Sequence, residues 1–413
     1  SIYQLHKITN DVSCVLLTGT IIMMRSILIV AILLSIAAAY YIYLPLPSTI
    51  SEPWKLMFMD SILRGVMHLV SFAFVSGPQS SPAIRVTETS FGGVQAQVFE
   101  STAADQEPHL KRGVVYFHGG GWTLGSGSKK TIFYCWSMAE ELDAVVISIE
   151  YRLAPEARFP DQYNEAVQAS KHILTAEVLS QYSIDPKRVA VSGDSAGANL
   201  AAAVAQQMAL DNSAPIKFKV QALLYPALQA LDFNTPSYQQ NSHIPILHRP
   251  LMARFWLEYL SGDPRLVMSL LANNHSTPTP SQEIAAAKAK TDWTKLLPVA
   301  FQKSYKPVFP LHGDPKLLEK LPGLLDVRAA PLLAETKVLK AVPPAYIMTC
   351  EHDVLRDDGL MYATRLEEAG VDVTVDHFED GFHGCLSFAF GPFRFSVGFR
   401  SFRSYTRWLK ENL

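Results

Sequence analysis

The 413-residue chain has no surplus of positive charge, because 36 Lys and Arg residues are balanced by 38 Asp and Glu residues. Proteins that hold nucleic acid through its phosphates usually carry such a surplus, so the composition predicts no nucleic-acid partner. Internal repeats and low-complexity tracts are also absent, which argues against a repeat array. The length suits one large domain with an insertion, or two domains, and a hydrophobic content of 48% allows a sizeable core.

Cysteine is scarce as well, and the four cysteines are Cys14, Cys135, Cys350 and Cys385. They show none of the paired spacings of a structural zinc site, so the sequence predicts no metal. Three of the four fall in the expected globular part, which leaves a disulfide open but assigns no pairing. The glycine-rich loop has neither a Walker lysine nor a GxGxxG spacing, so we predict no nucleotide or other cofactor.

Long apolar runs are confined to the N-terminal region. The uncharged run Ile27–Leu44 just meets the length that one membrane span requires, and tyrosines near its end suit the membrane interface. We predict a signal-anchor transmembrane helix over residues 24–45. The competing interpretation is a cleaved signal peptide with its small-residue site at Ala37–Ala39. Met24 looks like a natural start, which makes residues 1–23 an upstream extension of unknown role.

From residue 85 onward, strand-like and helix-like segments alternate. Short apolar runs predict strands at Arg85–Phe91, Val94–Glu100, Gly113–Phe117, Ala144–Tyr151, Arg188–Val191, Lys219–Tyr225, Ala345–Cys350 and Val371–Phe378. Helical spacing appears at Thr131–Leu142, Asp161–Leu174, Asn199–Leu210 and Asp358–Ala369, and in a last segment that ends near Leu413. Such alternation is typical of a mostly parallel sheet with helices on both faces. We therefore predict an α/β fold with an eight-stranded sheet in a domain over residues 85–413.

Residues 227–342 break this alternation. The stretch is rich in Pro, Asn and Ser, and its one amphipathic segment is Leu251–Leu260. We predict a cap insertion here, and an N-terminal cap or membrane-proximal segment over residues 46–84, where Trp54–Val75 has helical spacing. The two regions are expected to form an apolar mouth, to which the insertion contributes Phe255, Trp256 and Tyr259.

A serine stands between two glycines where an expected strand meets an expected helix, in Gly193-Asp194-Ser195-Ala196-Gly197. A turn this tight needs residues without bulky side chains. At its apex a serine hydroxyl is pushed out of the backbone, as in a nucleophile elbow. We predict Ser195 as an exposed nucleophile. The alternative is a turn that glycine merely softens.

A serine nucleophile needs a base, which is expected after the last strand. His383 lies there in a loop, between Gly381 and Gly384, and is the predicted base. His377 falls within the strand and is expected to point into packing.

The base in turn needs an acid that orients it, which is expected after the preceding strand. Asp353 follows that strand directly and is the predicted acid, with Glu351 as the alternative. Asp357 and Asp358 stand where a helix begins, and their expected role is to cap it.

The glycine-rich loop follows another strand and reads His118-Gly119-Gly120-Gly121-Trp122. Successive glycines allow backbone N–H groups to converge on one point with no side chain in the way. We predict an oxyanion hole from this loop, with Gly119, Gly120 and Gly121 as donors together with the N–H of Ala196.

The motifs HGGGW, YRLAPE, GDSAG, DVLRDDG and EDGFHG together resemble the hormone-sensitive-lipase-like group of α/β-hydrolases and, within it, the arylacetamide deacetylase family. The resemblance extends over nearly all of the chain after Met24, including MRSILIVAILLSIAAAYYIYLPLP. Two features depart from the family pattern. The stretch from Trp54 to Arg85 is shorter, which implies that part of the N-terminal cap is missing, and residues 1–23 have no counterpart.

This resemblance implies an α/β-hydrolase fold and a single-pass type II protein of the endoplasmic reticulum membrane with a lumenal catalytic domain. It implies hydrolysis of lipid esters, among them cholesteryl esters and acetylated monoalkylglycerol ethers. Carried over residue by residue, it makes Ser195, Asp353 and His383 the catalytic triad and His118–Gly120 the oxyanion motif.

Two other functions stay open at this stage. One is hydrolysis of amides or xenobiotic esters, as in the deacetylases. The other is a binding protein on a hydrolase scaffold, which the presence of both Ser195 and His383 disfavours. A lumenal domain would also make the sequon Asn274-His275-Ser276 available, so we predict a glycan at Asn274.

Overall fold

The computed structural model describes residues 23–25, 27–67, 83–102, 110–125, 129–260, 262–276, 282–308, 313–314, 316–391 and 394–413. The chain divides into two compact units. The N-terminal unit comprises residues 1–47 and 53–73, and the sheet unit comprises residues 48–52 and 74–413. The predicted upstream extension lies outside the described residues except for Met23.

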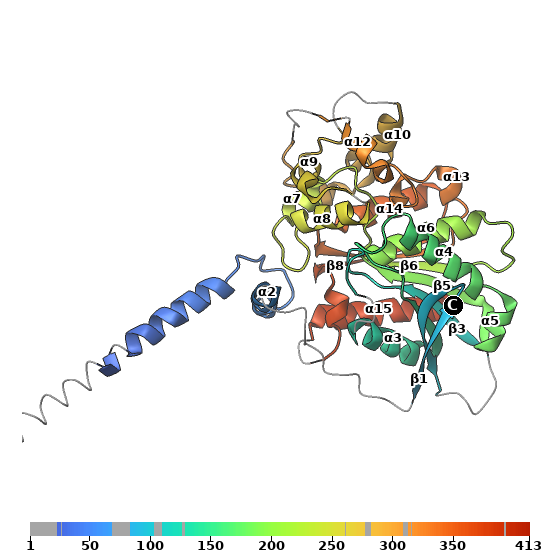
Figure 1. The fold of residues 1–413 in the computed structure, drawn as a ribbon, viewed down its shortest axis with the longest axis horizontal. Coiled ribbons are helices and arrows are strands. Elements are labelled where there is room, and N and C mark those ends of the chain that lie inside the picture. The colour runs from blue at the N-terminus through green and yellow to red at the C-terminus, as the bar shows by residue number, and fades with distance from the viewer. Residues whose placement is uncertain are drawn as a thin grey trace, which may run out of the picture. The chain divides into compact units, whose positions relative to one another are not determined.

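The sheet unit is built on eight strands in the order β1-β2-β4-β3-β5-β6-β7-β8 (Figure 1). Two neighbouring pairs, β1–β2 and β2–β4, are antiparallel, and the other five are parallel. The strands are β1 (Ile84–Phe91), β2 (Val94–Ser101), β3 (Lys111–Phe117), β4 (Ala144–Ile149), β5 (Ile184–Asp194), β6 (Val220–Leu224), β7 (Ala345–His352) and β8 (Val373–Phe382). The predicted eight-stranded, mostly parallel sheet is confirmed.

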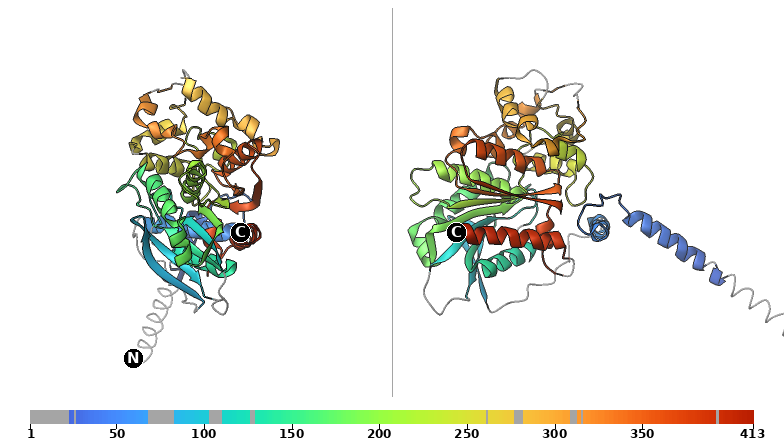
Figure 2. Two further views of the ribbon diagram at one scale, coloured as in Figure 1. Left: turned by 90° about the vertical axis from the view of Figure 1, so that its right-hand side faces the viewer. Right: turned by 180° about the vertical axis from the view of Figure 1, so that it is seen from behind.

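Helices cover both faces of this sheet (Figure 2). On one face α3 (Lys129–Leu142) and α15 (Ser396–Asn412) pack side by side, and on the other lie α4 (Asp161–Ile173), α6 (Ala196–Leu210) and α14 (Arg356–Glu368). The short helix α5 (Ala176–Gln181) precedes β5. Because helices cover both faces, β4 and β6 are buried at every position, which explains why they read as continuous apolar runs.

The insertion contains only helices and turns among its described residues. They are α7 (Pro236–Gln240), α8 (Arg249–Tyr259), α9 (Val267–Leu271), α10 (Gln282–Lys290), α11 (Trp293–Leu296), α12 (Lys316–Lys320) and α13 (Thr336–Leu339), with 3-10 turns between some of them. The predicted amphipathic segment is α8. It appears in yellow above the sheet in Figure 1.

Two buried carboxylates of α14 join the insertion to that helix. Asp358 Oδ2 accepts the N–H groups of Leu228 and Gln229 at 2.9 and 3.3 Å. Asp357 Oδ2 accepts the N–H of Ser237 at 2.6 Å. Both aspartates lie in the first turn of α14, as expected, but their partners belong to the insertion and not to that helix. The predicted capping role is therefore wrong.

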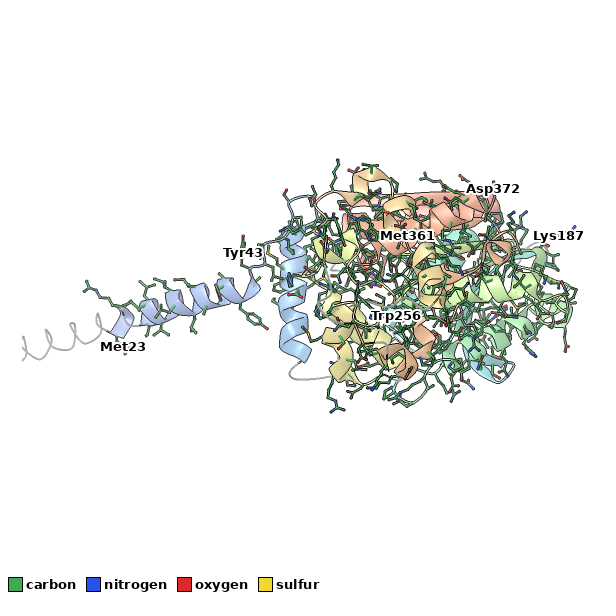
Figure 3. The ribbon with its side chains drawn as sticks, turned by 90° about the horizontal axis from the view of Figure 1, so that it is seen from above. Met23, Tyr43, Lys187, Trp256, Met361 and Asp372 are labelled. Carbon is green, nitrogen blue, oxygen red and sulfur yellow. The ribbon has the colours of Figure 1, made fainter. Side chains whose placement is uncertain are left out.

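The aromatic side chains of α8 also differ from expectation. Trp256 and Tyr259 are fully buried, and Tyr259 stacks on Trp122 with ring centroids 4.2 Å apart. Trp256 lies inside the sheet unit (Figure 3), 4.6 Å from the same indole. They form core and not a substrate mouth, since the flat face of Trp122 offers each of them apolar contact. Phe255 is only partly buried, so its ring can still line a substrate mouth.

The N-terminal unit contains the helix Met23–Ile42, which is long and apolar enough to cross a membrane, with a mean hydropathy of 2.1. Its ends are labelled by Met23 and the adjacent Tyr43 in Figure 3. A second helix, α2, spans Pro53–Met67. It covers most of the segment predicted from helical spacing, and residues 68–75 lie outside the described residues.

Candidate active site

Ser195 stands between the end of β5 and the first turn of α6, with φ 55° and ψ −116°. This backbone conformation is unfavourable for a residue with a side chain, and the Ser195 N–H holds it by donating to the Leu224 carbonyl at 2.9 Å. A Cβ at Gly197 would lie 2.0 Å from the Phe117 carbonyl, and one at Gly193 would lie 2.4 Å from the Gly197 carbonyl. Close backbone contact therefore requires both glycines, whereas the positive φ falls on the serine.

A chain of hydrogen bonds joins three of the predicted side chains. His383 Nε2 lies 3.0 Å from Ser195 Oγ, and His383 Nδ1 lies 2.8 Å from Asp353 Oδ2. The second carboxylate oxygen of Asp353 accepts the Leu355 N–H at 2.8 Å, which fixes the plane of the carboxylate. The three residues follow β5, β7 and β8, so the carboxyl ends of parallel strands bring them together.

All three side chains are buried, with exposed fractions of 7% for Ser195, 1% for Asp353 and 6% for His383. The predicted exposure of the Ser195 hydroxyl is therefore wrong, because His383 and the neighbouring loops close around it. Tyr225 adds to this enclosure, since its ring meets the His383 ring edge-on with centroids 4.9 Å apart. Burial raises the pKa of Tyr225 well above its usual value, so the phenol stays neutral.

The alternative acid and the strand histidine contact each other. His377 Nε2 lies 3.2 Å from Glu351 Oε2, and His377 Nδ1 lies 2.9 Å from Thr349 Oγ1. Glu351 also accepts a hydrogen bond from Arg356 at 2.8 Å. Burial works to raise the pKa of Glu351, but the hydrogen bond to His377 and the charge of Arg356 outweigh it, and the net shift is downward. Neither Glu351 nor His377 is joined to Ser195 by a hydrogen bond.

The glycine-rich loop is tied to the elbow through Asp194, the residue before the serine. Asp194 Oδ1 accepts the Gly119 N–H at 2.8 Å and the Tyr116 hydroxyl at 2.6 Å. The predicted donor Gly119 is thus occupied within the protein. The N–H groups of Gly120 and Gly121 donate to no described residue, and neither does that of Ala196 at the start of α6.

His118 supports the loop with its ring. Its Nδ1 lies 2.8 Å from the Gly119 carbonyl, and the ring stacks on Tyr151 with centroids 4.4 Å apart. The Tyr151 hydroxyl donates to the His118 carbonyl at 2.6 Å. The YRLAPE motif, which had no role in the sequence-based site, therefore begins with a residue that packs against the glycine-rich loop.

The loop that carries Asp353 has a further partner that the sequence did not reveal. Asn241, at the end of α7 in the insertion, donates from Nδ2 to the carbonyls of Glu351 and Asp353 at 3.0 and 3.1 Å. No local motif marks this asparagine, because its partners are more than 100 residues away. The NNHS stretch likewise gives only a sequon, and there Asn274 is partly buried while His275 and Ser276 are buried.

The described residues contain no group of three or more His, Cys, Asp or Glu side chains arranged to hold a metal ion. Three cysteines are described, Cys135, Cys350 and Cys385, and all three are free thiols in the interior. The sulfur atoms of Cys350 and Cys385 lie 3.8 Å apart. This distance is that of two packed thiols and not of a disulfide.

A family model described as alpha/beta hydrolase fold matches residues 114–292 and 316–387, which include every residue of the elbow and of its hydrogen-bonded chain. The chain belongs to this family. It is 50% identical to neutral cholesterol ester hydrolase 1 of Mus musculus over 94% of this chain and 100% of that relative. It is 42% identical to arylacetamide deacetylase of Oryctolagus cuniculus, over 93% of this chain and 99% of that relative.

Solved structures of esterases are similar to this chain in fold, at lower sequence identity. An esterase from Pyrobaculum calidifontis is 27% identical with a TM-score of 0.58, over 79% of this chain and 85% of that one. The thermostable carboxylesterase EstE1, cloned from a metagenomic library, is 25% identical with a TM-score of 0.58, over 89% and 99%. The predicted hydrolase fold, the predicted family and the prediction of an ester-hydrolysing enzyme are confirmed.

Proposed function

We propose that this protein is a membrane-anchored serine hydrolase that cleaves carboxylic esters of lipids through an acyl-enzyme. The observation that carries the proposal is the unbroken hydrogen-bonded chain from Ser195 Oγ through His383 to Asp353. In this arrangement Ser195 is the nucleophile, His383 the general base and Asp353 the group that orients the imidazole.

In the first step the Ser195 oxygen attacks the ester carbonyl while its proton passes to His383 Nε2. Asp353 accepts the Nδ1–H at 2.8 Å, so the imidazole presents a bare Nε2 to the serine and its positive charge is stabilised after proton transfer. His383 then donates this proton to the alcohol oxygen as the bond from the carbonyl carbon breaks. The alcohol leaves, and the acyl group remains on Ser195.

In the second step water replaces the alcohol. His383 takes a proton from the water as it attacks the acyl carbon, and it returns the proton to Ser195 Oγ when the acid departs. We assign oxyanion stabilisation in both steps to the N–H groups of Gly120, Gly121 and Ala196, because the Gly119 N–H is taken by Asp194. Losing one such donor typically costs about 2.7–4 kcal/mol of transition-state stabilisation.

The substrate class is proposed from the relatives and from two apolar features of the chain. The relative with 50% identity is named for cholesterol esters. The helix Met23–Ile42 suits a membrane anchor, which would keep the enzyme where lipid esters are dissolved. Phe255 packs against Gly121 of the glycine-rich loop and places an aromatic ring next to the proposed oxyanion donors. Cholesteryl esters and acetylated monoalkylglycerol ethers are the substrates that we propose.

The proposed location is the endoplasmic reticulum membrane, in type II orientation with the sheet unit in the lumen. A glycan on Asn274 would follow from that orientation. Treatment with a glycosidase should then reduce the apparent mass of the protein, and Asn274→Gln should abolish that change. Digestion of the sheet unit by protease added outside intact microsomes would contradict the orientation.

A second candidate is hydrolysis of aryl amides, which is favoured by the 42% identity to arylacetamide deacetylase. The same nucleophile and base serve both reactions, so the two candidates differ in substrate preference alone. An amide nitrogen leaves less readily than an ester oxygen, and His383 would have to protonate it earlier.

A fluorophosphonate probe followed by a substrate panel tests the proposal. The wild-type protein should be labelled at Ser195 and should hydrolyse a lipid ester with a higher kcat/KM than a short water-soluble amide. Ser195→Ala should lose both labelling and turnover, and its melting temperature should stay near that of the wild type because only one small hydroxyl is removed. Labelling of the variant at another serine would contradict the assigned nucleophile.

A further inference from the structure

A five-residue segment ahead of α2 belongs to the sheet unit, although the chain on both sides of it belongs to the N-terminal unit. This segment is Ser48–Glu52. Two of its residues are among the most buried of the N-terminal region, with exposed fractions of 3% for Ile50 and 6% for Ser51. A linker that only connected two units would stay solvated, so its burial indicates a defined role.

The segment contacts the strand end that carries the proposed acid. Thr49 Oγ1 lies 3.0 Å from His352 Nε2, and His352 is the residue immediately before Asp353. The His352 ring is itself buried, with an exposed fraction of 4%. Thr49 itself is exposed, so this hydrogen bond is only partly buried, and the His352 ring is its shielded partner.

The same segment contacts the strand end that carries the proposed base. The Ser51 N–H donates to the Asp380 carbonyl at 2.8 Å, three residues before His383. Glu52 accepts the Ser396 N–H at 3.1 Å, at the start of α15. The segment thus joins the ends of β7 and β8 to the first turn of the last helix.

The sheet is irregular near these strand ends. The ladder between β7 and β8 shifts register between Cys350 and His352 and resumes with the pair His352–Phe382, directly before Asp353 and His383. This pair is the last of the ladder, and Asp353 and His383 keep their 2.8 Å contact from the loops that follow it. The segment adds contacts from outside the sheet to both strand ends, through Thr49 and the backbone of Ser51.

We propose that Thr49 and Ser51 are positioning residues of the active site, which hold the loops of Asp353 and His383 at catalytic separation; the inference rests on the proposed function of those two residues. Thr49 acts through His352 on the acid, and Ser51 acts through Asp380 on the base. The membrane-proximal chain is thereby part of the catalytic framework as well as a linker. Small errors in the placement of catalytic groups lower kcat without altering substrate binding to the same degree.

The test uses the full chain with single substitutions and a soluble nitrophenyl ester, so that membrane delivery does not enter. Thr49→Val keeps the shape of the side chain and removes its hydroxyl, and Thr49→Ser restores it. The matched control is Thr374→Val, which removes a threonine hydrogen bond of the same 3.0 Å length, to Trp408, near the opposite end of β8. Active sites are counted by stoichiometric fluorophosphonate labelling, so kcat refers to folded molecules.

Thr49→Val should lower kcat per labelled site by about tenfold with KM within twofold, because the acid and base are held less accurately. The acidic limb of its profile of kcat/KM against pH should move, because the contact between Asp353 and His383 sets the basicity of the imidazole. Thr49→Ser should recover most of the rate, and Thr374→Val should leave both constants unchanged. A merely structural role would lower the melting temperature without moving the pH limb.

Thr49→Ala is the second variant should the valine prevent folding. Unchanged kcat and pH profile in either folded Thr49 variant would overturn the positioning role. The same holds if Thr49→Ser is as impaired as Thr49→Val. Ser195→Ala, measured in the same series, distinguishes failure of the proposed function from failure of the positioning role. If Ser195→Ala stays active, the proposed function is wrong. If Ser195→Ala is inactive and Thr49→Val is fully active, only the positioning role is refuted.

Discussion

Replacing Asp194 tests how the oxyanion loop is held in place. One oxygen of this carboxylate accepts both the Gly119 N–H at 2.8 Å and the Tyr116 hydroxyl at 2.6 Å. Hydrogen bonds to a charged group contribute about 1.5–3 kcal/mol each, so Asp194→Ala is expected to lower the free energy of unfolding by roughly 3 kcal/mol. In a protein of 413 residues such a loss corresponds to a fall in melting temperature of about 3–4 °C.

The effect on catalysis is expected to be larger than stability alone explains. Without Asp194 the Gly119 N–H is expected to turn toward another acceptor. The neighbouring Gly120 N–H then no longer points at the developing oxyanion. Loss of one oxyanion donor lowers kcat by about 10²–10³-fold. Asp194→Asn keeps an accepting oxygen but no charge, so its kcat should fall between those of the wild type and Asp194→Ala.

The matched control is Tyr116→Phe, which removes one donor to Asp194 and leaves the bond from Gly119. Its kcat should stay within about threefold of wild type, with a stability loss of about 1.5 kcal/mol. Unfolding in urea gives the stability, and turnover of a soluble nitrophenyl ester per fluorophosphonate-labelled site gives kcat. If Asp194→Ala unfolds at lower urea yet keeps kcat within threefold, the loop is positioned by other contacts and the reasoning is refuted.

Three further predictions follow from the described contacts. His383→Ala should abolish turnover, whereas His377→Gln should mainly lower stability, because His377 contacts Thr349 and not the serine. If only His377→Gln loses turnover, the assignment of His383 as the base is wrong. Burial raises the pKa of Asp358 from 3.8 to about 7, so its contribution to stability is full below pH 4 and is lost as the pH rises through 7. The stability difference between wild type and Asp358→Asn should therefore shrink from pH 4 to pH 8 in urea unfolding, and a constant difference would contradict the raised pKa. Deleting residues 1–44 should slow cleavage of a membrane-embedded lipid ester far more than that of a soluble nitrophenyl ester, and equal slowing would remove the physical support for substrate delivery by the anchor.

Much of the fold could be predicted because parallel strands that are buried on both faces leave a plain signal. The continuous apolar runs of β4 and β6 are typical of strands that are buried on both faces, and two glycines mark the tight turn at Ser195. Chain order then places polar residues directly after the strands, so Asp353 and His383 could be chosen before their contact with each other was seen. These features are local in sequence, and local physics determines them.

Tertiary structure decided what each side chain faces. Trp256 and Tyr259 have the same apolar character in a core as in a substrate mouth, and only the position of Trp122 shows that they are buried. Asp357 and Asp358 stand at the start of a helix, where a cap is expected, but their carboxylates accept hydrogen bonds from backbone N–H groups more than 100 residues away. Thr49 and Asn241 carry no motif at all, because hydrogen bonds to a distant strand end leave no pattern in the neighbouring sequence. Periodicity and turn chemistry act over a few residues, whereas burial and long-range hydrogen bonds exist only after the chain has folded.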